Sequence, residues 1–374
     1  MKNKEFSELP MYEKQMINNT LGIVSDFMDN KNRREYRKRL LKSINKVYFR
    51  SSNERIVSKR LDGTNALGES QGVINKNIGS VITKKENMFK STIYIDDTKT
   101  DDNLTIEKTL LHEMNHADTR NRGFVSKLVR YNGFITRDLP RLKTTGVAFN
   151  EAMNELYTQL MFYNEHKDIY QNVNSYDDIL YKPIIPEGYE GKYKSNSMYS
   201  NLILLAKLLV IVSDNNLGTS YDLLDTTKED FLSKQVYLHN GSKTIKNDLL
   251  YAGKYNPKGF KDHFDMITSD GKFEELLDSF DIVFDDMYKT PHTKDYQKNI
   301  DKANIYNIIN IIDEYKVNKF RLYTENGLWS KYQKRYYEAL YHDYTVYLSY
   351  RFGLDVKKVN ERDRILKLNC KEGN

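Results

Sequence analysis

Apolar residues recur at helical spacing in the central part of the chain, where they predict two consecutive helices. The first helix follows the N-cap candidates Asp101, Asp102 and Asn103, and its apolar face is formed by Leu110, Leu111, Met114 and Ala117. The second is expected to begin at Asn150, which can cap it, and its buried stripe is Ala152, Leu156, Leu160 and Tyr163. Each helix therefore has one face committed to the core and another left for polar side chains.

Two later segments also have the apolar pattern of buried helices. The run Leu202–Val212 is too short to cross a bilayer and contains Lys207 in its middle, so we expect a buried helix. In the tyrosine-rich segment Trp329–Phe352, one helical stripe consists of Tyr337, Tyr341, Tyr344 and Leu348, and a second of Tyr332, Tyr336, Leu340 and Tyr347. We expect these stripes to pack in a core or between domains, and a base-stacking platform is the alternative.

A small β-sheet is predicted ahead of the first central helix. Ser91–Asp96 alternates between two faces and is rich in β-branched and aromatic residues, and Val73–Ile74 and Val81–Thr83 are candidates for neighbouring strands. Only 6 prolines and 18 glycines occur in 374 residues, which favours helices over a turn-rich all-β fold. The expected fold class is therefore α+β, predominantly α-helical, with a small mixed β-sheet and helical flanking regions.

A strongly basic run extends from Lys31 to Arg50. Beneath its charges lies an apolar stripe of Tyr36, Leu40, Leu41, Ile44, Val47 and Tyr48, which predicts one amphipathic helix with a positive polar face. Because the net charge of the whole chain is only +6, we expect this face to be solvated. Contact with nucleic acid, an acidic partner or an anionic surface is the alternative.

The cysteine content and the N-terminus bear on the compartment. Cys370 is the single cysteine, so no intrachain disulfide can form and cysteine-rich zinc or iron–sulfur sites are excluded. Met1–Pro10 contains no apolar segment typical of a secretory signal. We therefore expect a cytoplasmic protein without a membrane span, and export as an effector by an unconventional route is the alternative.

The first central helix carries the motif His112-Glu113-Met114-Asn115-His116. Histidines four residues apart project from nearly the same side of a helix, so both imidazoles can reach one Zn²⁺ ion. Glu113 lies between them and can accept a proton from a metal-activated water, as a general base does. The alternative to a zinc site is that the two histidines have this spacing by chance and bind no metal.

A catalytic zinc site needs a third protein ligand and an open position. The continuation with glycine and a third histidine is absent, because Thr119 and Arg122 occupy those places. Asp118 follows His116 closely but points about 200° away from it around the helix. Glu151 and Glu155 on the second helix are again four residues apart, so one can bind zinc while the other accepts the free N–H of a ligating histidine. A solvated helix face is the alternative for this pair.

H-E-x-x-H followed some tens of residues later by Asn-Glu and a further acid resembles the gluzincin, or thermolysin-like, branch of the zinc metallopeptidases. The resemblance covers about 50 residues. It implies that His112, His116 and Glu151 bind Zn²⁺, that Glu113 is the catalytic base, and that Glu155 orients a ligand histidine. It also implies a zincin-like core in which a short edge strand, here Ser91–Asp96, pairs with an extended peptide substrate.

We therefore expect three regions: a basic helical N-terminal segment (1–60), a zincin-like catalytic core (61–215) and a helical C-terminal region (216–374). The expected function is a zinc metallopeptidase that hydrolyses a protein or peptide substrate with Glu113 as general base. The alternative is a zinc-containing regulatory or interaction protein, or an inactive zincin, that binds an acidic partner or nucleic acid through the basic helix. The sequence determines neither the cleavage specificity nor the oligomeric state.

Overall fold

The computed structural model describes residues 9–28, 33–63, 66–74, 89–120, 129–138, 143–169, 198–213, 236–237, 243–244, 249, 257–289, 301–325 and 331–359. Its helices are α2 (Met11–Met28), α3 (Arg33–Ser43), α4 (Arg50–Leu61), α6 (Asn103–Arg120), α7 (Val147–Glu165), η1 (Lys167–Ile169), α9 (Met198–Ser213), α13 (Pro257–Ile267), α14 (Lys272–Lys289), α15 (Lys302–Glu325) and α16 (Lys331–Phe352). Its strands are β1 (Ile44–Phe49), β2 (Gly68–Ile74), β3 (Phe89–Ile95), β4 (Val129–Asn132), β5 (Ile135–Asp138), β6 (Lys143–Thr145), β7 (Val236–Tyr237) and β8 (Lys243–Thr244). The predicted fold class, mainly helical with a small mixed sheet, is confirmed at this level.

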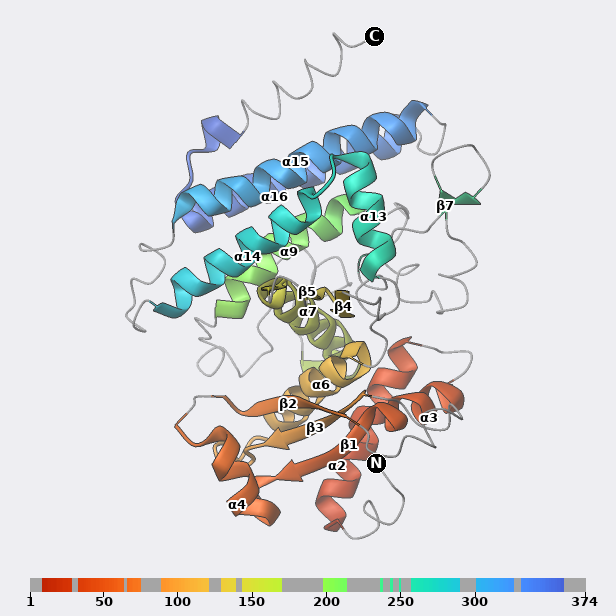
Figure 1. The fold of residues 1–374 in the computed structure, drawn as a ribbon, viewed down its shortest axis with the longest axis vertical. Helices are drawn as coiled ribbons and strands as arrows, with labels where there is room; N and C mark the ends of the chain where they lie inside the picture. Colours follow the sequence, from red (N-terminus) through yellow and green to blue (C-terminus); the bar gives the residue numbers. More distant parts are fainter. Residues whose placement is uncertain are drawn as a thin grey trace.

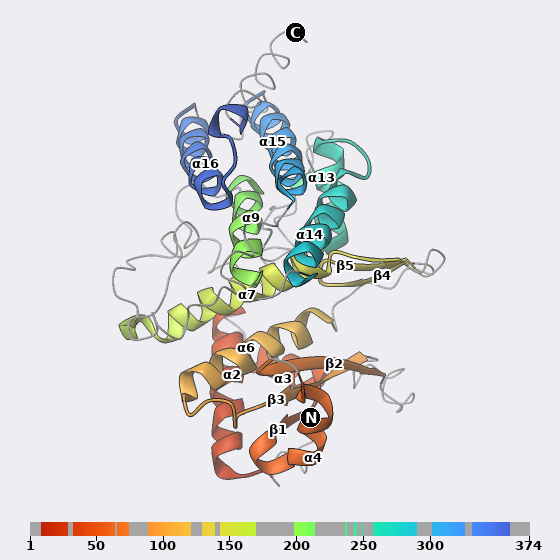
Figure 2. The same ribbon diagram turned by 90° about the vertical axis from the view of Figure 1, so that its left-hand side faces the viewer.

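The helices and the sheet of β1, β2 and β3 form two parts, and α6 and α7 lie between these parts (Figure 1). The sheet, together with α2, α3 and α4, forms one part, and the helices α9 and α13 to α16 form the other. In the view turned by 90°, α6 lies over the sheet and α7 runs beneath the C-terminal helices (Figure 2). The two helices predicted to carry the site are thus the ones that face each other at the middle of the molecule.

The mixed sheet has the order β1-β3-β2, with β1 parallel and β2 antiparallel to β3. The predicted strand at residues 91–96 therefore exists as β3, and Val73–Ile74 belongs to β2, whose register pairs Gly68 with Ile95 and Ile74 with Phe89. The expectation that this strand is an edge strand is wrong, because β1 covers its other side. Val81–Thr83 lies outside the described residues.

The predicted single helix over residues 31–50 is also wrong. The helix α3 ends at Ser43, and the following six residues form β1. Ile44, Val47 and Phe49 are β-branched or aromatic and almost completely buried in this strand, which pairs with β3. Strand β1, from the predicted N-terminal segment, and strand β3, which precedes α6, consequently belong to one sheet. The division of the chain near residues 60 and 215 stays a prediction.

The C-terminal helices pack as their apolar patterns predict. Residues Leu202 to Val212 of α9 are buried throughout, which confirms the prediction of a buried helix. On α16, the stripe of Tyr337, Tyr341, Tyr344 and Leu348 is buried, which confirms core packing for this stripe. Of the second stripe, Leu340 and Tyr347 are half-buried against the core, and the side chains of Tyr332 and Tyr336 are not among those described. The hydroxyl of Tyr344 donates to the Leu204 carbonyl oxygen at 3.1 Å and so joins α16 to α9. Within the described residues, no helix is long and apolar enough to cross a membrane.

A cluster of phenylalanines fixes the start of α7 against the C-terminal part. Phe149 on α7 lies edge-to-face with Phe134 of the β4–β5 turn and with Phe280 of α14, each at 5.0 Å between ring centroids. Phe273 contacts both Phe134 and Phe149 at 6.2 Å. Aromatic pairs of this kind contribute about 0.5–1.5 kcal/mol each beyond their burial. The helix turn that carries Glu151 is therefore held by a rigid apolar support.

Candidate metal centre

The site begins with the packing of α6. Asp102 caps this helix, since its carboxylate accepts the backbone N–H groups of Leu104 and Thr105 at 3.3 and 3.2 Å. The predicted apolar face is fully buried: Leu110, Leu111, Met114 and Ala117 each have 0 % exposure. Burial of this face turns the remaining face, with the two histidines, toward α7.

The start of α7 differs from the prediction that Asn150 caps the helix. The N-cap position is Gly146, in the left-handed conformation with φ of 80°, and the helix begins at Val147. The acceptor comes from a distant element: the Asp281 carboxylate on α14 accepts the N–H groups of Gly146 and Ala148 at 2.7 and 2.8 Å. Because this carboxylate supplies the cap, the helix starts one turn earlier than its own sequence indicates.

Asn150 instead attaches the β4–β5 turn to α7. Its Oδ1 accepts the N–H of Phe134 at 3.1 Å. Gly133 is needed for this approach: its φ is +58°, and a Cβ atom there would lie 2.2 Å from Asn150 Oδ1. The residue before Glu151 is therefore immobilised by a backbone contact.

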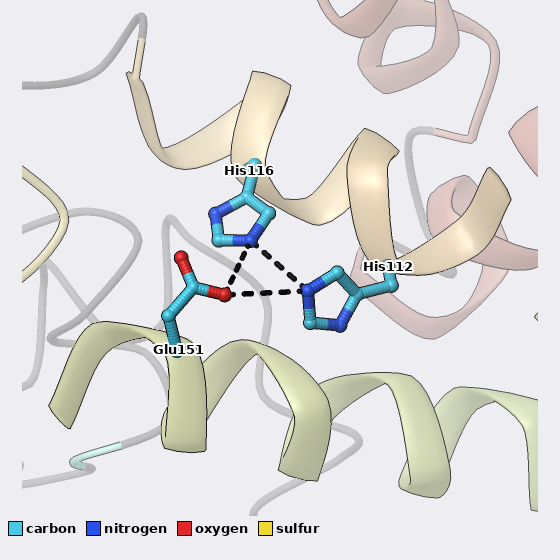
Figure 3. Close-up of side chains that lie close together, drawn as sticks. All are labelled: His112, His116 and Glu151. Atoms are coloured by element: carbon cyan, nitrogen blue, oxygen red, sulfur yellow. Dashed lines mark hydrogen bonds and ion pairs between the residues drawn. The ribbon is translucent and has the colours of Figure 1, made fainter. Parts of the chain in front are cut away.

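His112, His116 and Glu151 converge on one point between α6 and α7 (Figure 3). The Nε2 atoms of the two histidines are 3.0 Å apart, and Glu151 Oε2 lies 3.0 Å from Nε2 of His116 and 3.5 Å from Nε2 of His112. A tetrahedral zinc site with bonds of about 2.0–2.1 Å places its ligand atoms about 3.3 Å from one another. The three atoms thus have the spacing of three corners of such a tetrahedron, and among the described residues they form the one group of this kind.

The electrostatics of these groups favour a cation at the same point. Burial by itself would lower the pKa of His112, but hydrogen bonds to Glu151 and Glu155 and the nearby charge of Glu113 raise it well above its ordinary value. Burial would raise the pKa of Glu151, yet the two histidines hold it far below its usual range. Lone pairs and negative charge therefore surround the point between the three residues, where they would stabilise a proton or a metal ion.

Glu155 lies behind His112, one turn further along α7. Its Oε2 is 3.0 Å from Nδ1 of His112, and its Oε1 is 2.9 Å from Nζ of Lys108. Burial opposes ionisation of this carboxyl, but the Lys108 charge and the His112 hydrogen bond lower its pKa to about 2. Glu155 is thus an ionised acceptor for the Nδ1–H of His112, which leaves the Nε2 lone pair facing the cluster.

Asn154 is a contact of the site that the sequence interpretation missed. Its side-chain amide lies against Nδ1 of His116, and its Oδ1 is buried with no hydrogen-bond partner among the described residues. A half-turn of the amide places Oδ1 where it accepts the Nδ1–H of His116. The sequence contains a signal for this residue, because the dipeptide Asn-Glu occurs at 150–151 and again, one helical turn later, at 154–155.

Glu113 is buried beside strand β2, with 6 % exposure. A Cβ atom on Gly68 would lie 2.7 Å from Thr109 Cγ2 and 3.1 Å from Glu113 Oε1. The strand thus approaches α6 so closely that a larger residue at position 68 would force the Thr109 and Glu113 side chains to shift. This brings a strand backbone next to the carboxylate between the two histidines.

The structure does not bring the other candidate residues to the cluster. Asp118 has 0 % exposure and accepts a hydrogen bond from the Tyr36 hydroxyl of α3, on another side of α6. Of the remaining histidines, His166 pairs with Glu107 at 2.9 Å, His263 is buried among the C-terminal helices, and His342 is exposed. His239 and His292 lie outside the described residues. None of these three described histidines therefore lies at the cluster to stabilise an oxyanion.

Comparison of the chain with protein-family models, with curated proteins and with solved structures finds no match. The residues of the cluster are therefore the features of the chain that indicate a function.

Proposed function

We propose that the protein is a zinc-dependent metallopeptidase with a gluzincin-type site in a zincin-like core. The observation that supports this proposal is the convergence of the His112, His116 and Glu151 ligand atoms, all within 4.8 Å of one another, with Glu113 in the same helical turn. Two imidazoles and one carboxylate are a donor set that zinc uses in hydrolytic sites, where a fourth position stays open.

His112, His116 and Glu151 would hold the ion. When bound, zinc acts as a Lewis acid and lowers the pKa of a coordinated water toward 7. Glu113 accepts a proton from the attacking water and returns it to the leaving amine. Glu113 is buried beside β2, and it is near enough to His112 for its charge to raise the pKa of that histidine, which supports a role next to the ion.

The groups behind the histidines determine which ring nitrogen faces the ion. Glu155 accepts from Nδ1 of His112 at 3.0 Å, and Asn154 contacts Nδ1 of His116. An acceptor at Nδ1 keeps the proton there and leaves Nε2 free to bind metal. Lys108 balances the charge of Glu155, which keeps that carboxylate ionised beside a cationic site.

Strand β2 is the element best placed to bind an extended peptide. One of its sides pairs with β3, and no strand covers the other side among the described residues. The backbone N–H and C=O groups on the outer side of an edge strand can pair with a peptide backbone by β-augmentation. Since Gly68 lies against Glu113, a peptide paired with this edge would pass beside the general base.

The proposal is tested by peptide cleavage with zinc-loaded protein and its Glu113→Gln variant on a mixed peptide library. We expect cleavage by the parent chain and a loss of about 10²–10⁴-fold in the variant, with zinc content unchanged. Glu165→Gln, an exposed change at the end of α7, is the matched control and should cleave like the parent. Equal cleavage by the parent and the Glu113→Gln variant contradicts the mechanism. Stable zinc without turnover on any peptide favours an interaction protein instead.

A further inference from the structure

Helix α3 carries most of the net charge of the chain. Its eleven residues include one acid, Glu35, and six basic residues, Arg33, Arg34, Arg37, Lys38, Arg39 and Lys42. The net charge of the helix is +5, against +6 for all 374 residues. The charges of all other residues therefore sum to +1, so α3 is a local concentration of positive charge.

The core determines which side of α3 faces the solvent. Tyr36 and Leu40 have 0 % exposure and hold one side of the helix against the body of the protein. Arg34, Lys38 and Lys42, spaced four residues apart, are exposed on a different side. Successive members of this row are separated by about 6 Å along the helix axis. The exposed row is thus a line of three cationic groups on one side of α3, of which Lys38 also pairs with the exposed Glu35 at 2.7 Å.

We propose that the exposed row Arg34, Lys38 and Lys42 of α3 binds the phosphate backbone of nucleic acid. Lysine and arginine recognise phosphate through charge-assisted hydrogen bonds. A line of cations without base-reading groups fits a polymer with regularly spaced negative charges, and it gives binding that is independent of sequence.

The apolar side chains of α3 argue against the two other anionic partners. A helix that lies on a membrane needs a free apolar face to insert into the lipid. In α3, Tyr36 and Leu40 are buried in the protein core and are not accessible to lipid. A protein partner is usually anchored by apolar or aromatic side chains at the centre of the interface, and the exposed row contains none. Charge is therefore the property that this surface offers.

The proposed surface is separate from the metal centre. Tyr36 of α3 contacts Asp118 of α6, which points about 200° around that helix from His116. In both ribbon views α6 lies between α3 and α7 (Figures 1 and 2). Nucleic acid on α3 would thus leave the side of α6 that faces α7 accessible, and binding should not depend on zinc.

The test is fluorescence anisotropy of labelled 20-nucleotide DNA, single-stranded and duplex, titrated with the full chain at several salt concentrations. The charge-reversal variant is Arg34→Glu/Lys38→Glu/Lys42→Glu. Its matched control is Arg351→Glu/Lys357→Glu/Lys358→Glu, which reverses three exposed charges at the other end of the molecule. The milder variant Arg34→Gln/Lys38→Gln/Lys42→Gln and circular dichroism show whether a loss reflects misfolding.

We expect the parent chain to bind and the α3 variants to lose at least tenfold in affinity, while the control stays within about threefold. The slope of log affinity against log salt should fall by about 2–3, since three phosphate contacts are removed. Absence of binding by the parent at low salt, or equal losses in the α3 and control variants, overturns the proposal. Binding to phosphatidylserine vesicles without binding to DNA also overturns it, in favour of a membrane surface. Neither outcome changes peptide cleavage, so failure here is distinguishable from failure of the proposed enzyme.

Discussion

Glu155 Oε2 lies 3.0 Å from Nδ1 of His112, while Nε2 of the same ring faces Glu151 and His116. The Nδ1–H of the ring thus donates a hydrogen bond to Glu155, and its Nε2 lone pair faces the cluster. Such outer contacts orient a ligand histidine and increase its basicity. In the proposed zinc site, this relationship would give Glu155 a positioning role that is distinct from metal ligation.

Replacement of Glu155 by alanine should weaken zinc binding by about 10- to 100-fold, because His112 loses the acceptor that fixes its tautomer. Competition with a chromophoric chelator measures this affinity. Glu165→Gln provides the control on the same helix and should bind zinc like the parent. If Glu155→Ala retains full affinity, the contact with His112 does not position the ligand.

Asn154 is predicted to accept the Nδ1–H of His116 and so to fix the tautomer of this ring, as Glu155 does for His112. Asn154→Ala should lower zinc affinity about tenfold or more, whereas Asn154→Asp should retain it, because a carboxylate oxygen accepts the Nδ1–H. ¹⁵N chemical shifts of the His116 ring report the tautomer directly. Thr158→Val is the control: it removes the Thr158 hydrogen bonds with the Asn115 amide at 3.1 Å and with the Asn154 carbonyl oxygen at 2.8 Å, and it leaves both histidines and the Asn154 side chain in place. Equal losses in Thr158→Val and Asn154→Ala would assign a purely structural role.

Gly68→Ala should reduce peptide cleavage by roughly 10- to 100-fold while leaving zinc affinity unchanged, since misplacement of a catalytic group by about 1 Å has effects of this size. The added methyl would lie 2.7 Å from Thr109 Cγ2 and 3.0 Å from Glu113 Cγ, so β2 and the carboxylate must separate. The double variant Gly68→Ala/Thr109→Ser removes the closest of these contacts and should recover part of the activity. Full activity in Gly68→Ala would show that β2 does not position Glu113.

The pair between His166 and Glu107 should make stability depend on pH. The hydrogen bond with Glu107 raises the pKa of His166, which is about 6.5 in an unfolded chain. Its contribution is therefore fully present below pH of about 6.5 and is lost as the pH rises through the raised value in the folded state. His166→Gln should lower the free energy of unfolding more at pH 6 than at pH 9, by up to about 1 kcal/mol. Urea denaturation measures this difference, and His342→Gln is the control at an exposed histidine.

The parts of the fold that depend on local patterns were predictable from the sequence. The helix with His112 and His116 follows from nearby apolar spacing and an Asp102 cap, and Glu151 and Glu155 share a face because they are four residues apart. The geometry brings these side chains together as the spacing indicated, although their role in metal binding stays a prediction.

The remaining features depend on contacts between residues distant in sequence. The segment Ile44–Phe49 becomes a strand because it pairs with β3, more than 40 residues away, and this pairing also makes β3 central. The start of α7 is set by Asp281, 135 residues from Gly146. The local sequence reveals neither β3 as the partner of Ile44–Phe49 nor Asp281 as the cap of α7. At Ile44–Phe49 the apolar residues also fit helical spacing, so the pattern alone does not favour a strand.

The central claim, a zinc site made by His112, His116 and Glu151, is tested most directly by the zinc content of the protein after dialysis against a weak chelator. Mass spectrometry of the metal should find about one zinc per chain in the parent and in Glu165→Gln, and almost none in His116→Ala or Glu151→Ala, because each removes one of three ligands. Absence of zinc in the parent, or equal zinc in the parent and in both ligand variants, would contradict the account.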